Sequence, residues 1–154
     1  MRTIHEWLNE YGESHKNETN KLIHWICVPT IVFAILALLY AVKLPFYIAG
    51  FQLNLGIFIS VGALIYYFLL SPSLSVGMVF YLVVCMVLAK LIEASGIIPL
   101  WLFSVIVFVL AWVGQFYGHK IEGKKPSFLK DIQFLMIGPA WLMSFIYKKI
   151  GVAL

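Results

Sequence analysis

The stretch from Leu22 to Lys43 reads LIHWICVPTIVFAILALLYAVK, and it decides the fold class. It is almost entirely apolar, and Pro45 follows shortly after its closing lysine. An α-helix needs roughly 20 apolar residues to cross the hydrocarbon core of a bilayer. The stretch therefore predicts a membrane-spanning helix.

Further apolar stretches follow this first one, separated by short polar or proline-containing connections. They run from about Leu53 to Leu70, from Leu74 to Ile92 and from Ile97 to Tyr117. We predict an all-α, multi-pass membrane bundle of four transmembrane helices, built as a single domain over residues 1–154. The last apolar stretch, Ile132 to Tyr147, is short and carries Gly138-Pro139 at its middle. It fits a fifth span, a re-entrant hairpin or an interfacial helix.

The composition supports a membrane environment. Hydrophobic residues make up 62% of the chain and charged residues 12%, against about 25% charged in an ordinary soluble domain. The net charge of +4 comes from lysines at the ends of apolar segments, which is a topology signal and not a nucleic-acid footprint. With four spans, only Lys43 and Lys90 of the 11 basic residues lie opposite the two termini. The bias predicts both termini on the cytoplasmic side, in a bacterial inner membrane or a eukaryotic endoplasmic reticulum membrane, and argues against a fully crossing last stretch.

The segment before the first span has a different pattern. Between Thr3 and Glu13, apolar residues recur at helical spacing and glutamates share the other side, which predicts an amphipathic helix at the membrane interface. Asn17 is a good N-cap for the helix that then enters the membrane. Near the end of the third span, Lys90 and Glu93 are three positions apart and are expected to pair.

Histidines gather on the predicted cytoplasmic face. Antiparallel packing of four spans brings the start of the first and the end of the fourth to the same depth. His24 shares a helical face with Asn17 and Asn20, whereas His15, nine positions earlier, would point away on a continuous helix. The chain must therefore bend near Asn17 for both histidines to meet. At the other segment, a second polar face combines Gln115, His119 and Glu122.

These residues predict a metal site. A lone interfacial histidine is ordinarily a satisfied polar residue, and this is our interpretation of His5. His15, His24 and His119 together, with Asn17, Asn20, Gln115 and Glu122 around them, are better explained by a bound metal. Imidazoles with a carboxylate suit Fe, Zn or Cu, and a facial site with open positions is typical of non-haem Fe(II). Four histidines are too few for the two-iron site of membrane hydroxylases and desaturases.

The same segments carry a family resemblance. Residues 11–24 (YGESHKNETNKLIH) with Val28-Pro29, and residues 112–119 (WVGQFYGH) with Glu122 and Pro126, resemble the fungal 2-hydroxy-fatty-acid dioxygenase family and its bacterial relatives. The resemblance spans essentially the whole chain in layout. It implies an Fe(II)-dependent α-oxygenase that converts a long-chain 2-hydroxy fatty acid and O2 to the acid one carbon shorter and CO2, a step of phytosphingosine breakdown in fungi.

The resemblance implies that His15, His24 and His119 are iron ligands. Gln115 and Glu122 match motif positions, and their expected part in catalysis is inferred from the helical face that they share with His119. Asn17 and Asn20 are expected to orient the imidazoles. Lys120 or Lys124 would steer the substrate carboxylate, and the apolar helices would hold the acyl tail among membrane lipid.

Two other kinds of protein stay open. A non-enzymatic membrane carrier of metals or other ions would need polar residues along a path to the far side, and the spans are nearly devoid of them. A structural or lipid-binding membrane protein would leave the histidines merely hydrogen-bonded, and it predicts no stoichiometric metal.

Overall fold

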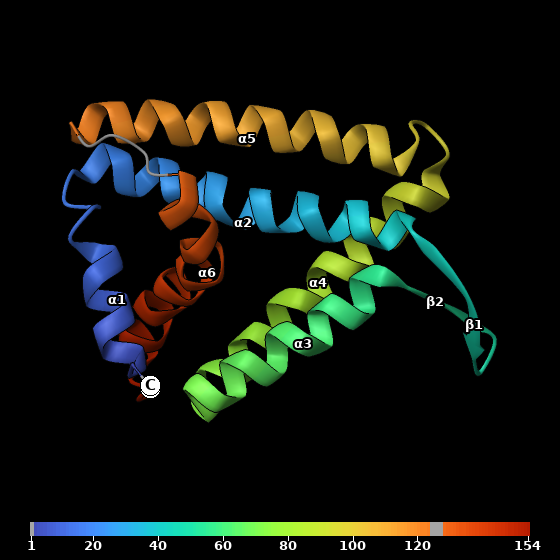
Figure 1. Cartoon of the computed structure of the whole chain (residues 1–154), viewed down its shortest axis with the longest axis horizontal. Helices are drawn as coiled ribbons and strands as arrows, with labels where there is room; N and C mark the ends of the chain where they lie inside the picture. The colour runs from blue at the N-terminus through green and yellow to red at the C-terminus, as the bar shows by residue number, and fades with distance from the viewer. Residues whose placement is uncertain (1, 124–127) are drawn as a thin grey trace.

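The structure, a computed structural model, describes residues 2–123 and 128–154, and its elements are mostly helices (Figure 1). In chain order they are α1 (Ile4–Gly12), α2 (Glu18–Ala41), β1 (Lys43–Ile48), β2 (Phe51–Asn54), α3 (Leu55–Leu70), α4 (Pro72–Ser95), α5 (Leu100–Glu122) and α6 (Phe128–Ile150). Among the described residues, α2, α4 and α5 are long and apolar enough to cross a membrane, whereas α3, with 16 residues, is apolar but shorter. The helical class is confirmed, and three candidate spans stand where four were predicted.

Two antiparallel helices form the spine of the molecule. Figure 1 shows α2 and α5 side by side along their length, with the α3–α4 pair diverging from one end of α2 and the α1–α6 pair from the other. The two ends of α2 therefore have different neighbours. One end lies beside the hairpin and α3, and the other lies near α1, α6 and the end of α5. The first of these ends is called the hairpin end below, and the second the histidine end.

Glycines bring α2 and α5 together. A Cβ on Gly114 would lie 2.6 Å from Cys27 Sγ, and a Cβ on Gly118 would lie 2.4 Å from Asn20 Oδ1. Real Cβ atoms essentially never come so close to other heavy atoms, so a larger residue at either position would force Cys27, Asn20 or the helices themselves to shift. Small residues four apart let membrane helices approach closely. The residues around Gly118 are thereby held within reach of those around Asn20.

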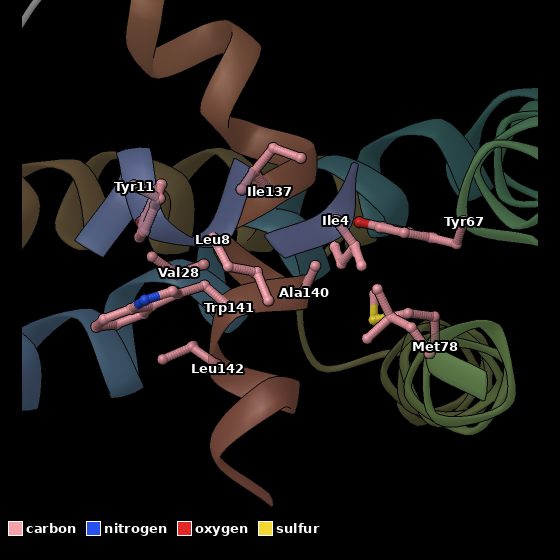
Figure 2. Close-up of a cluster of buried hydrophobic side chains, with 11 residues drawn as sticks. Ile4, Leu8, Tyr11, Val28, Tyr67, Met78, Ile137, Ala140, Trp141 and Leu142 are labelled. Atoms are coloured by element: carbon pink, nitrogen blue, oxygen red, sulfur yellow. The ribbon is translucent and has the colours of Figure 1, made fainter. Parts of the chain in front are cut away.

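The short helix α1 packs its apolar face on α6. Figure 2 shows Ile4, Leu8 and Tyr11 of α1 against Ile137 and Trp141 of α6, all of them buried. A capping box starts α1: the Glu6 carboxylate accepts hydrogen bonds from the Thr3 backbone N–H and hydroxyl, and these bonds lower the pKa of Glu6. A short helix with a buried apolar face thus lies where the amphipathic helix was predicted, and its place at a membrane interface stays a prediction.

The last apolar stretch forms one helix, α6, and not a hairpin. Gly138 lets α6 pass close to its neighbours, because a Cβ there would lie 3.0 Å from Val28 Cγ1 and 3.1 Å from Tyr11 Oη. Two residues before Gly138, the Met136 carbonyl accepts a hydrogen bond from the Tyr67 hydroxyl at 2.6 Å. The segment containing Pro139 is thus anchored by contacts from α1, α2 and α3.

Sequence reasoning missed the β-hairpin between α2 and α3. Its turn is formed by Ala49 and Gly50, with φ of 48° and 78°, and left-handed residues at both turn positions suit the twist of a two-stranded hairpin. The hairpin places Lys43 beside α4, where its ammonium lies 2.9 Å from Glu93 Oε2 and 3.8 Å from the Tyr40 ring centroid. Glu93 therefore pairs with Lys43, and the expected pairing with Lys90 is wrong.

Candidate metal centre

Three histidines from separate segments meet at the histidine end. His15 lies in the loop between α1 and α2, His24 lies early in α2, and His119 lies in the last turn of α5. One potential ligand atom of each ring lies within 4.8 Å of the others, and His15 and His24 are buried. The ring centroids of His15 and His24 are 4.2 Å apart, and that of His119 is 5.2 Å from His24. The convergence expected from topology is therefore present, while His5 is exposed on α1 and outside this cluster.

Backbone carbonyls orient two of these rings. His15 Nδ1 lies 2.6 Å from the Tyr11 carbonyl oxygen, and His24 Nδ1 lies 2.8 Å from that of Asn20. A carbonyl oxygen only accepts, so each Nδ1 carries a proton, and in the neutral ring Nε2 then has the lone pair. Metal-binding histidines are commonly held in this way, with the second ring nitrogen donating to a carbonyl or carboxylate. The donor set fits a first-row transition metal such as Fe, Zn or Cu.

The carboxylate of Glu122 holds the loop that carries His15. It accepts hydrogen bonds from the backbone N–H groups of Lys16 and Asn17 at 2.8 and 3.0 Å, and from the Asn20 side-chain amide at 3.0 Å. Both carboxylate oxygens are used in these contacts. Because Glu122 follows His119 on α5, the contacts tie the loop to the helix that supplies the third histidine.

Asn17 produces the expected bend between His15 and His24. Its side-chain oxygen accepts from the backbone N–H groups of Thr19 and Asn20 at 2.9 and 3.2 Å, as an N-cap does. With α1 ending at Gly12 and α2 beginning at Glu18, the intervening loop turns His15 back toward His24.

Two buried amides lie close to the histidines along the chain. Gln115 is one helical turn before His119, and Asn20 is one turn before His24; their relative exposures are 7% and 0%. Within residues 2–123 and 128–154, Gln115 Oε1 and Asn20 Oδ1 have no hydrogen-bond partner. Burying such oxygens is unfavourable without a polar partner, which fits a site that takes up a polar group.

Aromatic rings cover one side of His15. Tyr11 stacks on it with a centroid distance of 4.2 Å and an interplanar angle of 11°, and the Trp141 centroid lies 5.4 Å away. Sequence reasoning gave neither Tyr11 nor Trp141 a role at the site. Tyr11 does belong to the family-like segment, but nothing in the sequence pairs Trp141 with a histidine more than a hundred positions earlier.

A pocket of about 750 Å³ opens beside His15. Its walls come from α1, the α1–α2 loop, α2 and α6, and they are formed by Leu8, Asn9, Gly12, Glu13, His15, Lys16, Lys21, Trp141 and Phe145. Lys120, expected at the substrate carboxylate, is exposed on α5 and is not among these lining residues. Lys124, the other expected residue, lies outside the described residues.

A bundle with apolar helices of membrane-spanning length and a three-histidine cluster at one end, two of its histidines buried, defines a class: helical proteins of membrane type with a candidate metal centre. Residues 1–150 match the family described as 2-hydroxy-palmitic acid dioxygenase Mpo1-like, and the chain belongs to that family. It is similar to the 2-hydroxy-palmitic acid dioxygenase MPO1 of Saccharomyces cerevisiae, with 30% identity over 147 residues, 92% of this chain and 78% of the relative. No solved structure matches the chain. The family expected from the two motifs is confirmed.

Proposed function

We propose that this protein is a membrane-embedded, Fe(II)-dependent dioxygenase of long-chain 2-hydroxy fatty acids, and that His15, His24 and His119 hold its iron. The observation that carries the proposal is the meeting of three imidazoles within 4.8 Å, in a chain of the Mpo1-like family. The yeast relative is a 2-hydroxy-palmitic acid dioxygenase by name, which supports the same substrate class here.

The reaction balances without another reductant. A 2-hydroxy acid, RCH(OH)COOH, and O2 give RCOOH, CO2 and H2O. The acid loses four electrons, and O2 accepts four. Iron, when bound, supplies Lewis acidity and the redox activity that O2 chemistry requires.

The protein's own residues prepare the ligand atoms. The carbonyls of Tyr11 and Asn20 keep the protons on Nδ1 of the two buried histidines, so Nε2 of each is ready to bind metal. Glu122 holds the α1–α2 loop, which keeps His15 near His119. We therefore assign Glu122 to positioning, in place of the direct catalytic role expected from the sequence. The stacked Tyr11 ring shields His15 from water on one side.

The site is confined to one end of the bundle, which favours an enzyme over a carrier. Beyond His24, the buried side chains of α2 are apolar up to Tyr40: Val28, Ile31, Ala34, Leu36 and Ala37. A carrier needs polar groups that continue toward the other face. The described part of α2 offers none along this buried side.

The test is the metal content of detergent-purified protein loaded anaerobically with Fe(II), measured by mass spectrometry together with O2 uptake on 2-hydroxyhexadecanoate. We expect one iron per chain in the wild type and its loss, with that of O2 uptake, in His15→Ala, His24→Ala and His119→Ala. His5→Ala is the matched control, because His5 is exposed and outside the cluster, and it should retain both. Iron retained in all three variants would refute the ligand assignment, and iron without O2 uptake would refute the reaction.

A further inference from the structure

We infer that the pocket beside His15 is the binding site of the fatty acid, with Lys16 at the carboxylate and the rings of Trp141 and Phe145 along the first part of the acyl chain. The inference rests on the proposed function for the chemical class of the ligand. Its evidence is the placement of charged and apolar side chains around one opening.

The size and position of the pocket suit a small-molecule site. Its volume of about 750 Å³ lies within the range of roughly 300–1,000 Å³ usual for ligand pockets. His15 forms part of its wall, so a molecule bound there lies next to the histidine cluster. The walls come from α1, the α1–α2 loop, α2 and α6, and none of the lining residues belongs to α5.

Charged as well as apolar side chains line the pocket. Lys16 and Lys21 are among the lining residues, and Lys21 is already paired with Glu18 at 2.7 Å. Lys16 is exposed and makes no ion pair within the part of the chain that the structure describes, while its backbone N–H is held by Glu122. The Lys16 backbone is therefore held next to His15, and its ammonium has no ion-pair partner among the described residues. Glu13 also lines the pocket and would repel a carboxylate placed beside it.

Apolar surface continues from the pocket outward. The Phe145 ring lies 4.7 Å from Trp141 and 6.2 Å from Trp25 of α2, with centroids compared in both cases. Phe145 and Trp25 are 40% and 39% exposed, on helices of a chain whose exposed residues are largely apolar. A ligand that leaves the pocket along these rings remains in contact with apolar groups up to the lipid. A ligand with an anionic head and a long apolar tail can contact both Lys16 and the aromatic rings. A small soluble anion would not contact the rings, and a neutral lipid would not neutralise the charge of Lys16.

The inference replaces the expected carboxylate contact. Sequence reasoning named Lys120 or Lys124 for this contact. Lys120 follows His119 directly on α5, and neighbours on a helix point in different directions. Lys16 follows His15 in the same way, but in a loop whose chain path places both residues on the pocket wall.

The test measures ligand binding to the metal-free full chain in phosphatidylcholine nanodiscs. A hexadecanoic acid bearing a diazirine is crosslinked by light, the crosslinks are mapped by peptide mass spectrometry, and hexadecanoate or hexadecanol is used as competitor. We expect crosslinks on α1 and α6. Lys16→Gln should weaken hexadecanoate binding about tenfold, as the loss of one charge-assisted contact does, and leave hexadecanol unchanged. Phe145→Ser should weaken both competitors.

Lys43→Gln is the matched control, a lysine at the hairpin end, and should change neither competitor. Equal effects of Lys16→Gln and Lys43→Gln, an acid-specific loss in Lys120→Gln alone, or crosslinks at the β-hairpin would overturn the inference. Both Lys16 and Phe145 are at least partly exposed, so the variants should fold. The binding test contains no metal, so its result does not depend on whether the proposed reaction occurs. If the protein shows normal O2 uptake but Lys16→Gln binds hexadecanoate as the wild type does, the pocket assignment is overturned and the proposed function is not.

Discussion

Each end of α2 is held to another helix by a glutamate of that helix, but the two glutamates bind different kinds of partner. At the histidine end, Glu122 accepts from two backbone N–H groups and from the Asn20 amide, whose side chain is buried. At the hairpin end, Glu93 meets the flexible ammonium of Lys43, with side-chain exposures of 41% and 30%. Backbone donors fix a carboxylate in one place, whereas two long side chains form an ion pair that tolerates movement. The comparison indicates that the contacts of Glu122 fix the backbone at the histidine end, whereas the ion pair of Glu93 leaves the hairpin end freer to move.

The largest effect should come from forcing the helices apart at the histidine end. In Gly118→Ala the new Cβ would lie 2.4 Å from Asn20 Oδ1, so we expect a loss of about 3 kcal/mol in unfolding free energy and a loss of iron binding. Gly62→Ala on α3 is the control, because its Cβ meets nothing within 4 Å and should stabilise the helix by roughly 0.5–1 kcal/mol. Thermal unfolding followed by circular dichroism and metal analysis would measure both. Equal stability of the two variants would show that the close packing of α2 and α5 is unimportant.

Glu122→Gln should have the next largest effect, and it concerns the metal more than the fold. The neutral amide cannot accept the same three hydrogen bonds as strongly, so we expect iron affinity to fall about 10–100-fold, as is typical when a supporting residue is changed. Competition with a chromophoric chelator would measure the affinity. Unchanged affinity would mean that the loop presents His15 without help from α5.

The part of the site that could be predicted depended on helical period and topology. His15, His24 and His119 could be brought together because an even number of antiparallel apolar segments returns the chain to the same face, and Asn17 marked the bend as a helix cap. The role of Glu122 could not be predicted, because facing on one helix says nothing about the loop that approaches it. The pocket was missed for a related reason: it needs α6, whose packing depends on long-range contacts of Gly138 and Trp141.

The fold shows the same limit. Apolar length predicted the helices well, but α3 is shorter than a typical span, and the hairpin after α2 carries no Asn-Gly signal at its Ala49-Gly50 turn. Lys90 and Glu93 were paired from local spacing, and the hairpin brought in Lys43 as the partner instead.

Asn17→Ala should have a moderate effect and show whether a cap at the histidine end matters beyond stability. Loss of its hydrogen bonds to Thr19 and Asn20 should cost about 1 kcal/mol and also weaken iron binding, because the bend before His24 loosens. Ser71→Ala removes the equivalent cap of α4, whose hydroxyl accepts from Leu74 at 3.2 Å, and should cost a similar amount with iron unchanged. Denaturant titrations with and without metal would separate the two. Identical behaviour of the variants toward iron would reduce Asn17 to an ordinary cap.

Glu93→Gln should have the smallest effect. It removes a partly exposed ion pair at the hairpin end, which is worth less than about 1 kcal/mol, and should leave iron affinity and O2 uptake at wild-type levels. The same substitution chemistry as in Glu122→Gln then gives two different outcomes. A loss of iron in Glu93→Gln would abolish the distinction between the two ends.

The contact between Lys16 and Glu122 joins residues 106 positions apart and encloses most of the chain. During synthesis, His15 and His24 leave the ribosome long before α5 exists, and until then they are two of the three histidines of the cluster. In the proposed iron enzyme, metal loading therefore has to follow the packing of α5 beside α2. A chain that stops short of α5 has His15 and His24 without His119.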